Sequence, residues 1–328
     1  MPGSKRTLAM VLACLFCAQA VLPQDSALDT AKAAFEKGDY SQAIETLKAA
    51  ATKAPGDGEI YLLLTKSYLE LKQYDNAVNS AEKAVAIDPK NSVGHQWLGE
   101  AYGAKADHSS MLSAYSWARK TQKEFDTAVQ LDAHNYNAVQ DLIEYDCTAP
   151  SMVGGGEDKA QALIAKLMQM NAAEAHYGAG VCKAQKKDYA GADAEYAKAL
   201  ENKPSTANRV YDIGDYFLQR SQGDKLLVVA AQGEALAPKD PRNKYYRACA
   251  QILKGEQLAD AEKLLRDYLQ TAPPNSQYPA SWQAHYWLGR LFEAQRNNAA
   301  AKNEYETALK GNSKYKPAQD ALKRLGGS

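Results

Sequence analysis

The stretch that decides the fold is Gly58–Asn91, which reads GEIYLLLTKSYLELKQYDNAVNSAEKAVAIDPKN. The preceding stretch repeats its landmarks 34 residues earlier, so that Ala43 corresponds to Ala77 and Pro55 to Pro89. A fixed period of this size is the signature of a repeat array. Each copy predicts two amphipathic helices joined by a short turn. A proline closes the second helix because its ring cannot join the helical hydrogen-bond ladder.

Eight copies account for nearly all of the chain after its first residues. Helices of about 12 residues are marginal alone in water, so each unit depends on its neighbours for stability. We therefore predict one all-α solenoid over residues 21–328. The units are placed at 24–57, 58–91, 92–135, 136–172, 173–206, 207–240, 242–275 and 282–315, with a capping helix at 316–325.

Small residues mark the places where the two helices of a unit meet. Small side chains facing each other let the helix axes approach closely, while Leu, Tyr and Phe one turn away fill the space between them. The small residues are Gly99, Gly180, Gly214 and Gly289 on first helices, and Ala43, Ala77, Ala192 and Ala301 on second helices.

Two central units and the end of the chain depart from the pattern. From Met111 to Leu131 the apolar positions keep helical spacing, which predicts a second helix lengthened by roughly two or three turns. In the fourth unit, residues 148–156 replace the tight turn with a loop that ends in three glycines and cannot continue either helix. Residues 316–325 form an amphipathic segment whose charged outer face suits a solvating cap.

This pattern resembles the tetratricopeptide repeat (TPR) family, and several copies match it at many positions at once. The resemblance implies a right-handed superhelix of about eight helix-turn-helix units whose first helices line a concave groove. It also implies that the groove binds peptides or partner proteins. The two central departures are similar to those of an exported bacterial subgroup of the family.

The family's groove-facing places predict a line of partner-binding residues. These are the second, fifth, ninth and twelfth places of each first helix. Tyrosine there offers a flat face, and asparagine pairs with a peptide backbone. The alternative is that the tyrosine rings pack between adjacent first helices, since the chain has 20 Tyr against 5 Phe. The predicted binding residues are Tyr177, Asn208, Tyr211, Asp215, Asn243, Tyr246, Tyr286 and Arg290.

The first twenty residues read as a secretory signal peptide. Lys5 and Arg6 precede an apolar run, and Ala18 and Ala20 supply the small residues of a cleavage site. We expect cleavage near Ala20 and a periplasmic or extracellular protein. The alternatives are a retained N-terminal helix and a lipid anchor at Cys14.

Charge and composition narrow the classes of partner. The chain has 39 basic and 39 acidic residues, so it lacks the long-range field that nucleic acid or anionic membrane binding needs. We expect a protein or peptide partner, no nucleic acid and no membrane span. The oligomeric state stays open, and the charged cap favours a monomer.

Cysteine and histidine offer little chemistry. Cys147, Cys182 and Cys249 lack the paired spacing of a zinc site. A Cys147–Cys182 bridge stays open, but we expect buried thiols because free Cys is among the most buried residue types. Five histidines spread over different units are expected to be structural, so we predict no metal and no cofactor.

No catalytic arrangement can be singled out. The glycine-rich loop only superficially resembles a phosphate-binding loop, because two acids precede Lys159 and no Ser or Thr follows it. The sequence therefore predicts a non-enzymatic interaction scaffold, with envelope assembly as its setting by family resemblance. The alternatives are an adaptor for a glycan or other small ligand, and an accessory subunit of an enzyme complex.

Overall fold

The computed structural model describes residues 24–326, and within them every regular element is helical. The predicted signal peptide lies outside the described residues. Of the described helices, none is both long enough and apolar enough to span a membrane. The helices are α1 (Gln24–Glu36), α2 (Tyr40–Lys53), α3 (Gly58–Glu70), α4 (Tyr74–Ile87), α5 (Ser92–Asp107), α6 (Met111–Leu131), α7 (Tyr136–Thr148), η1 (Ser151–Val153), α8 (Glu157–Met168), α9 (Ala172–Gln185), α10 (Tyr189–Glu201), α11 (Ala207–Gln219), α12 (Gly223–Leu236), α13 (Arg242–Lys254), α14 (Leu258–Thr271), α15 (Ser281–Ala294), α16 (Asn298–Gly311) and α17 (Lys316–Gly326).

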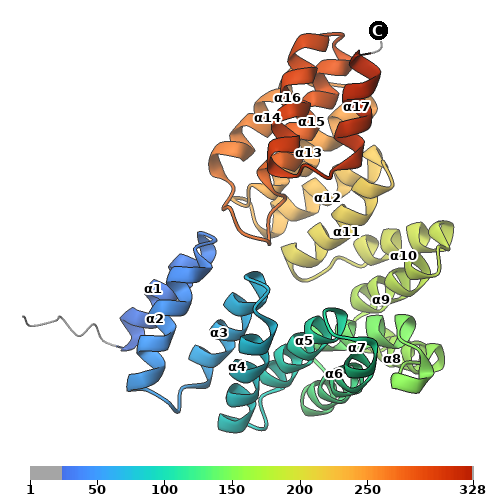
Figure 1. The fold of residues 1–328 in the computed structure, drawn as a ribbon. Helices are drawn as coiled ribbons and strands as arrows, with labels where there is room; N and C mark the ends of the chain where they lie inside the picture. Colours follow the sequence, from blue (N-terminus) through green and yellow to red (C-terminus); the bar gives the residue numbers. More distant parts are fainter. Residues whose placement is uncertain (1–23, 327–328) are drawn as a thin grey trace, which may run out of the picture.

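Successive helices pair and the pairs stack along an arc, from blue α1–α2 to red α15–α17 (Figure 1). The buried apolar residues form three clusters that follow one another along the chain rather than one central core. The prediction of an all-α solenoid of helix pairs with a terminal helix is confirmed.

The turns inside five of the units share one backbone conformation. Two residues before a second helix, the chain enters the left-handed region at Gly38, Lys72, Lys187, Ser221 and Arg296. First helices begin on side-chain caps: Asp57, Asn91 and Asn171 each accept a hydrogen bond from a backbone N–H of the first turn. Local chemistry thus sets the same hairpin in unit after unit.

The small residues lie where the sequence predicts, but with a different neighbour. The facing alanines are fully buried, yet an aromatic ring of the second helix lies directly over each of three glycines. A Cβ on Gly99 would lie 2.5 Å from the ring of Phe125, and one on Gly289 would lie 2.5 Å from the ring of Tyr305. The glycines therefore accommodate aromatic rings as well as close helix axes.

The central units carry a long helix and a covalent link. Helix α6 has 21 residues, whereas α4 in the preceding unit has 14. Cys147 of α7 and Cys182 of α9 form a disulfide, with their Cα atoms 5.4 Å apart. Our expectation of buried thiols is therefore wrong for these two, because neighbouring first helices bring them within bonding reach. Cys249 is a buried free thiol.

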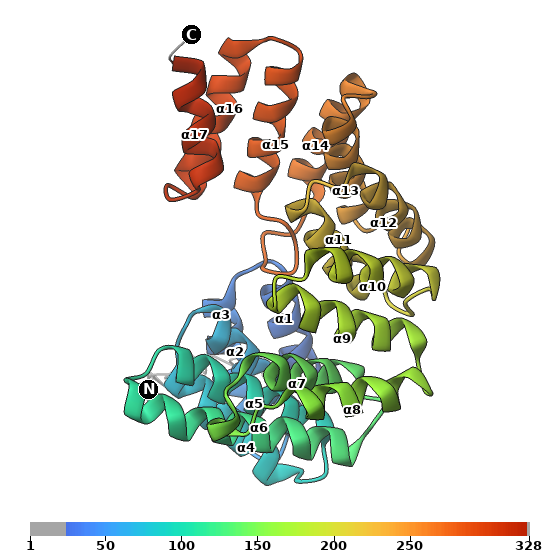
Figure 2. The ribbon, with the colours of Figure 1, turned by 90° about the vertical axis from the view of Figure 1, so that its right-hand side faces the viewer.

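The segment between α14 and α15, residues 272–280, reaches across the hollow to the first unit, and we call it the clasp loop. Figure 2 shows it descending to the blue helices at the start of the chain. Asn275 Nδ2 donates to the backbone oxygen of Glu36 at 2.6 Å, and the backbone N–H of Ser276 donates to Tyr40 Oη at 3.3 Å. The solenoid therefore closes on itself through residues more than 230 positions apart.

Candidate partner-binding groove

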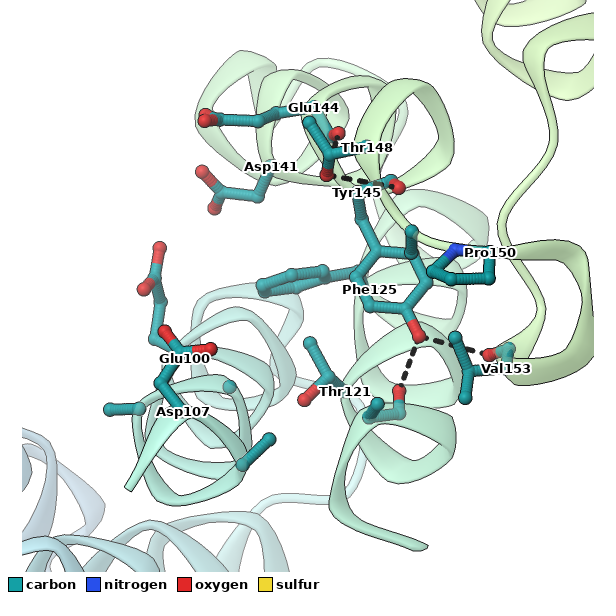
Figure 3. A pocket seen from close by; sticks show the side chains of 15 residues that line it. Glu100, Asp107, Thr121, Phe125, Asp141, Glu144, Tyr145, Thr148, Pro150 and Val153 are labelled. Carbon is teal, nitrogen blue, oxygen red and sulfur yellow. Dashed lines mark hydrogen bonds between the residues drawn. The ribbon is translucent and has the colours of Figure 1, made fainter. Parts of the chain in front are cut away.

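First helices α5, α7 and α11 carry five carboxylates, which we call the acidic row: Glu100, Asp141, Glu144, Asp212 and Asp215. The first three line a cavity of about 530 Å³ between α5, α6 and α7, the central cavity. Figure 3 shows their carboxylates directed toward the same open side of this cavity. The last two line a smaller cavity beside α13 and the clasp loop.

The glycine-rich loop forms one wall of the central cavity. Tyr145 Oη donates to the backbone oxygens of Ala118 at 2.7 Å and Val153 at 2.9 Å, which ties α7 to α6 and to η1 (Figure 3). Gly154 has φ 103°, and a Cβ on Gly155 would lie only 2.1 Å from the oxygen of Ala149. These two glycines are needed for the turn, which is why the segment has its composition.

The protein environment disfavours negative charge in the central cavity. Burial raises the pKa of Glu100, and the nearby charge of Glu144 raises it further. Burial likewise raises the pKa of Asp141, and repulsion from both glutamates adds to it. Although solvent reaches Glu144 at the rim, surrounding protein atoms withdraw part of its hydration and raise its pKa. Arg209 and the hydrogen bond from Gln96 lower the pKa of Asp141, but they do not offset its desolvation and the repulsion from the two glutamates.

The acidic row continues on α11. Solvent reaches both Asp212 and Asp215 at the groove surface, but surrounding protein atoms withdraw part of their hydration and raise both pKa values. The pKa of Asp212 stays raised despite a 3.1 Å contact between its Oδ2 and Arg209 Nη1. Asp215 Oδ1 accepts a hydrogen bond from Tyr246 at 2.7 Å. Tyr177 lies between the two halves: burial raises its pKa most, and the charges of Asp212 on one side and Glu144 on the other raise it further.

Three of the predicted binding residues are buried. Tyr211 and Tyr246 are only 2% and 1% exposed, and their rings stack with centres 5.6 Å apart. Tyr211 Oη donates to Oδ1 of Asn243, which is also buried. Tyr211 and Tyr246 pack between adjacent first helices, as the alternative held, and both still line the smaller cavity. The role of these three residues as partner contacts stays a prediction.

The other predicted residues keep some exposure. Asn208 is exposed, and its Oδ1 accepts a hydrogen bond from Arg242 at 2.8 Å. Tyr177 is half-buried beneath the guanidinium of Arg209, 4.0 Å from its ring centre. Asp215 is exposed within the acidic row. Their role as partner contacts stays a prediction.

The last unit holds the remaining two. Tyr286 and Arg290 are half-buried on α15. The ring of Tyr286 meets that of Tyr315 edge-on with centres 5.0 Å apart, and Arg290 lies 4.7 Å from the ring centre of Trp287. They lie apart from the central cavity, so a partner that reached all predicted residues would have to follow the groove over several units.

Two buried arginines escaped the sequence reasoning. Arg209 donates from Nε to the buried Glu174 at 3.0 Å, and Arg242 donates from Nη2 to Asp240 at 2.6 Å. Each guanidinium lies over a tyrosine ring of the preceding unit, Arg242 at 4.1 Å from the centre of Tyr211. Such stacking is favourable when the cation is desolvated, so these arginines join successive units.

The acidic row was also missed, although a signal for it existed. The ninth place of the first helix, which already gave Asp215, is Glu100 in the third unit and Glu144 in the fourth. Applying the same place to the two irregular units would have found both. Asp141 and Asp212 lie at the sixth place, for which the resemblance gives no groove role.

The histidines have a repeated structural partner. His95, His176 and His285 occupy the same place in three units, and each Nδ1 lies 2.6–2.7 Å from a glutamate of the second helix in its own unit. These contacts fasten the first helix to the second. The histidines are thus engaged within their units rather than gathered at one site.

Comparisons with known proteins agree with this architecture. Three segments match tetratricopeptide repeat family models, namely residues 34–100, 173–206 and 253–317, which together are just over half of the chain. Small glutamine-rich tetratricopeptide repeat-containing protein 2 of Saccharomyces cerevisiae is 30% identical over 132 residues. That match spans 38% of this chain and 38% of the yeast protein.

Two solved structures are also similar. A thermophilic TPR protein from Thermus thermophilus is 18% identical, with a TM-score of 0.45, and the match covers 70% of this chain and 100% of that one. A tetratricopeptide repeat protein from Parabacteroides merdae is 15% identical, with a TM-score of 0.44, and the match covers 92% and 98%. From the repeat matches and its stacked helix pairs, the chain belongs to the tetratricopeptide repeat proteins.

Proposed function

We propose that this protein is a non-enzymatic scaffold whose concave groove binds an extended, basic segment of a partner protein. Proteins of this family generally mediate protein–protein interactions. The observation that carries the finer statement is the acidic row, whose five carboxylates all have raised pKa values.

A basic partner fits because its positive charges would offset the desolvation and mutual repulsion of the carboxylates in the groove. A lysine or arginine side chain beside Glu100 or Glu144 would stabilise the ionised carboxylate and form a charge-assisted hydrogen bond. Apolar wall residues of the central cavity, such as Phe125 and Val153, would contact the aliphatic part of the same side chain. Affinity should therefore fall with rising salt and with falling pH.

A glycan adaptor receives less support from the same groove. Sugar faces stack on exposed aromatic rings, but Tyr211 and Tyr246 are buried. The role of accessory subunit in an enzyme complex uses the same basic-segment contact, with catalysis in the partner.

Peptide arrays test the proposal with the full chain. Lysine- and arginine-rich peptides should bind, whereas acidic peptides and glycans should not. The double substitution Glu100→Gln/Glu144→Gln should weaken the best peptide by about tenfold, equivalent to about 1.4 kcal/mol. The matched control Glu45→Gln/Glu201→Gln changes two exposed carboxylates on second helices and should leave affinity unchanged. Equal binding by both double variants would refute the groove assignment.

We further propose that the protein works in the bacterial envelope after export, as the predicted signal peptide suggests. N-terminal sequencing of protein recovered from cell fractions tests this. A mature chain starting near Val21 in the periplasmic fraction is expected, and an intact N-terminus in the cytoplasm would contradict it.

A further inference from the structure

An exposed apolar cluster lies at the start of α6, beside η1. Met111 and Leu112 are each 90% exposed, Met152 is 68% exposed and Tyr115 is 43% exposed. Tyr115 Oη donates to the backbone oxygen of Met152 at 3.0 Å, which holds the start of α6 beside η1. We call these four residues the apolar tip. Contiguous exposed apolar side chains of this kind mark interaction sites, whereas single ones are ordinary.

Basic residues lie directly behind the apolar tip. A trough of about 630 Å³ between α6 and η1 is lined by Arg119, Lys120 and Lys123 together with Tyr115 and Met152. Between Met111 and Lys123 the sequence contains no acidic residue. The three cations also form no ion pair within the described part of the chain, so their charges are available to an external anion.

Trp117 follows the tip in the same helix, and its half-buried ring packs with its centre 5.5 Å from that of Tyr102 on α5. Lys120 Nζ is 4.4 Å from the ring centre of Trp117. Tryptophan and tyrosine favour the boundary between water and lipid, and basic side chains near them reach toward headgroups. The order along α6 is therefore apolar, aromatic and then cationic.

We propose that the apolar tip and its basic trough dock the protein on an anionic lipid surface. Met111, Leu112 and Met152 would enter the outer part of the acyl region, while Arg119 and Lys123 contact lipid phosphates. The chain as a whole is neutral, so the attraction is local and acts only at short range.

Charge and exposure favour an anionic bilayer as the occupant. Met111 and Leu112 are adjacent on the first turn of α6, so they point about 100° apart around the helix axis. A fluid layer accepts both side chains at once, and its phosphates would meet the three cations of the trough. Tyr115 lies three and four positions from these two residues, a spacing that a protein groove also takes, so the test below includes self-association.

Vesicle co-sedimentation of the full chain tests this. Binding to vesicles of phosphatidylglycerol and phosphatidylcholine should be about tenfold tighter than to phosphatidylcholine alone. Met111→Ser/Leu112→Ser should lose about tenfold in affinity, and Arg119→Gln/Lys123→Gln should lose the preference for anionic lipid. Because every variant keeps the same N-terminus, the predicted signal peptide contributes equally to all of them.

The matched control is Val228→Ser/Leu236→Ser, which removes two exposed apolar side chains of α12, 42% and 44% exposed, and should bind like the unaltered chain. Unchanged circular dichroism of the tip variants shows that they still fold. Equal vesicle binding by the unaltered chain and the Met111→Ser/Leu112→Ser variant would overturn the proposal. So would self-association that the tip variant abolishes, seen in ultracentrifugation without vesicle binding, because it would assign the tip to a second copy of the chain.

Discussion

At the scale of single residues, the acidic row connects stability to binding. Asp141 has a raised pKa because burial and the charges of Glu100 and Glu144 oppose its ionisation. The folded chain therefore holds this proton more tightly than the unfolded chain, in which an aspartate has a pKa of about 3.9. Stability from this residue is highest below that value and decreases as pH rises through the folded pKa. With the pKa of Asp141 raised to about 8, folding at neutral pH must supply this carboxylate with a proton, and that lowers the stability of the protein.

Substituting Asp141→Asn should stabilise the protein at pH 7. Asparagine keeps an oxygen for the hydrogen bond from Gln96 Nε2, now 2.8 Å from Asp141 Oδ2, but removes the charge. We expect a gain of about 1 kcal/mol, kept small because solvent screens a half-buried carboxylate. Urea denaturation at pH 7 and pH 4 measures it, and the gain should vanish at pH 4. A gain of equal size at both pH values would show that charge is not its cause.

Two glycines of α5 should respond in opposite directions to the same substitution. Gly99→Ala would bring a Cβ within 2.5 Å of the Phe125 ring, and such overpacking costs about 1–3 kcal/mol. At Gly103 the nearest atom would be 3.6 Å away, so Gly103→Ala should gain up to about 1 kcal/mol from helix propensity. Thermal unfolding of both variants checks the pair. Similar shifts for both would mean that Phe125 moves aside.

The sequence predicted where the small glycines lie in each first helix, but not which side chain packs on them. Repeat spacing fixes which residues face the second helix, so Gly99 and Gly289 could be placed. It does not reveal that Phe125 or Tyr305 lies over them, since a side chain's direction depends on its rotamer. For the same reason the tyrosines could be assigned to neighbouring first helices, but only packing shows that Tyr211 and Tyr246 are buried.

At the scale of elements, the 34-residue repeat period and the helix-capping residues predicted most of the helices. Residues 92–135 could be read as one unit with a long second helix because apolar spacing continues through α6. The disulfide was decided by a distance between two first helices, which two cysteines 35 residues apart leave undetermined. The sequence thus shows that a disulfide between neighbouring units is possible, but it does not determine whether the bond forms.

The Cys147–Cys182 disulfide should stabilise the central units. It closes a segment of 35 residues and joins α7 to α9, and the chain-entropy relation gives about 3–4 kcal/mol for such a loop. Cys147→Ser/Cys182→Ser, or reduction, should lower the unfolding midpoint in denaturant accordingly. Cys249→Ser controls for loss of a thiol outside the bridge. An unchanged midpoint after reduction would show that helix packing alone holds the two units together.

At the scale of the whole molecule, the clasp loop changes an open spiral into a closed one. Arg242 Nη1 donates to the backbone oxygen of Gln277 at 3.2 Å, and its guanidinium lies 4.8 Å from the ring centre of Tyr278. The loop therefore rests on the groove side of α13 while its tip contacts the first unit. In a repeat array each unit is expected to contact only its neighbours. The sequence therefore did not predict the contact between the clasp loop and the first unit.

Gly38 provides the means to open the clasp. It has φ 73°, and an added Cβ would lie 2.3 Å from the backbone oxygen of Pro274, which cannot move independently of the loop. Gly38→Ala should displace residues 272–280, enlarge the radius of gyration in small-angle scattering and speed amide exchange at Ser276 by about tenfold or more.

Gly255→Ala is the matched control for that experiment, because Gly255 has φ 69° and no atom would lie within 4 Å of its Cβ. Both substitutions bear the same left-handed strain of about 1–2 kcal/mol, but only Gly38→Ala meets the clasp loop. Asn275→Ala, which removes the donor to Glu36, should reproduce the expansion without the strain. Scattering curves that are identical for all three variants would mean that stacking along the array fixes the curvature and that the clasp merely follows it.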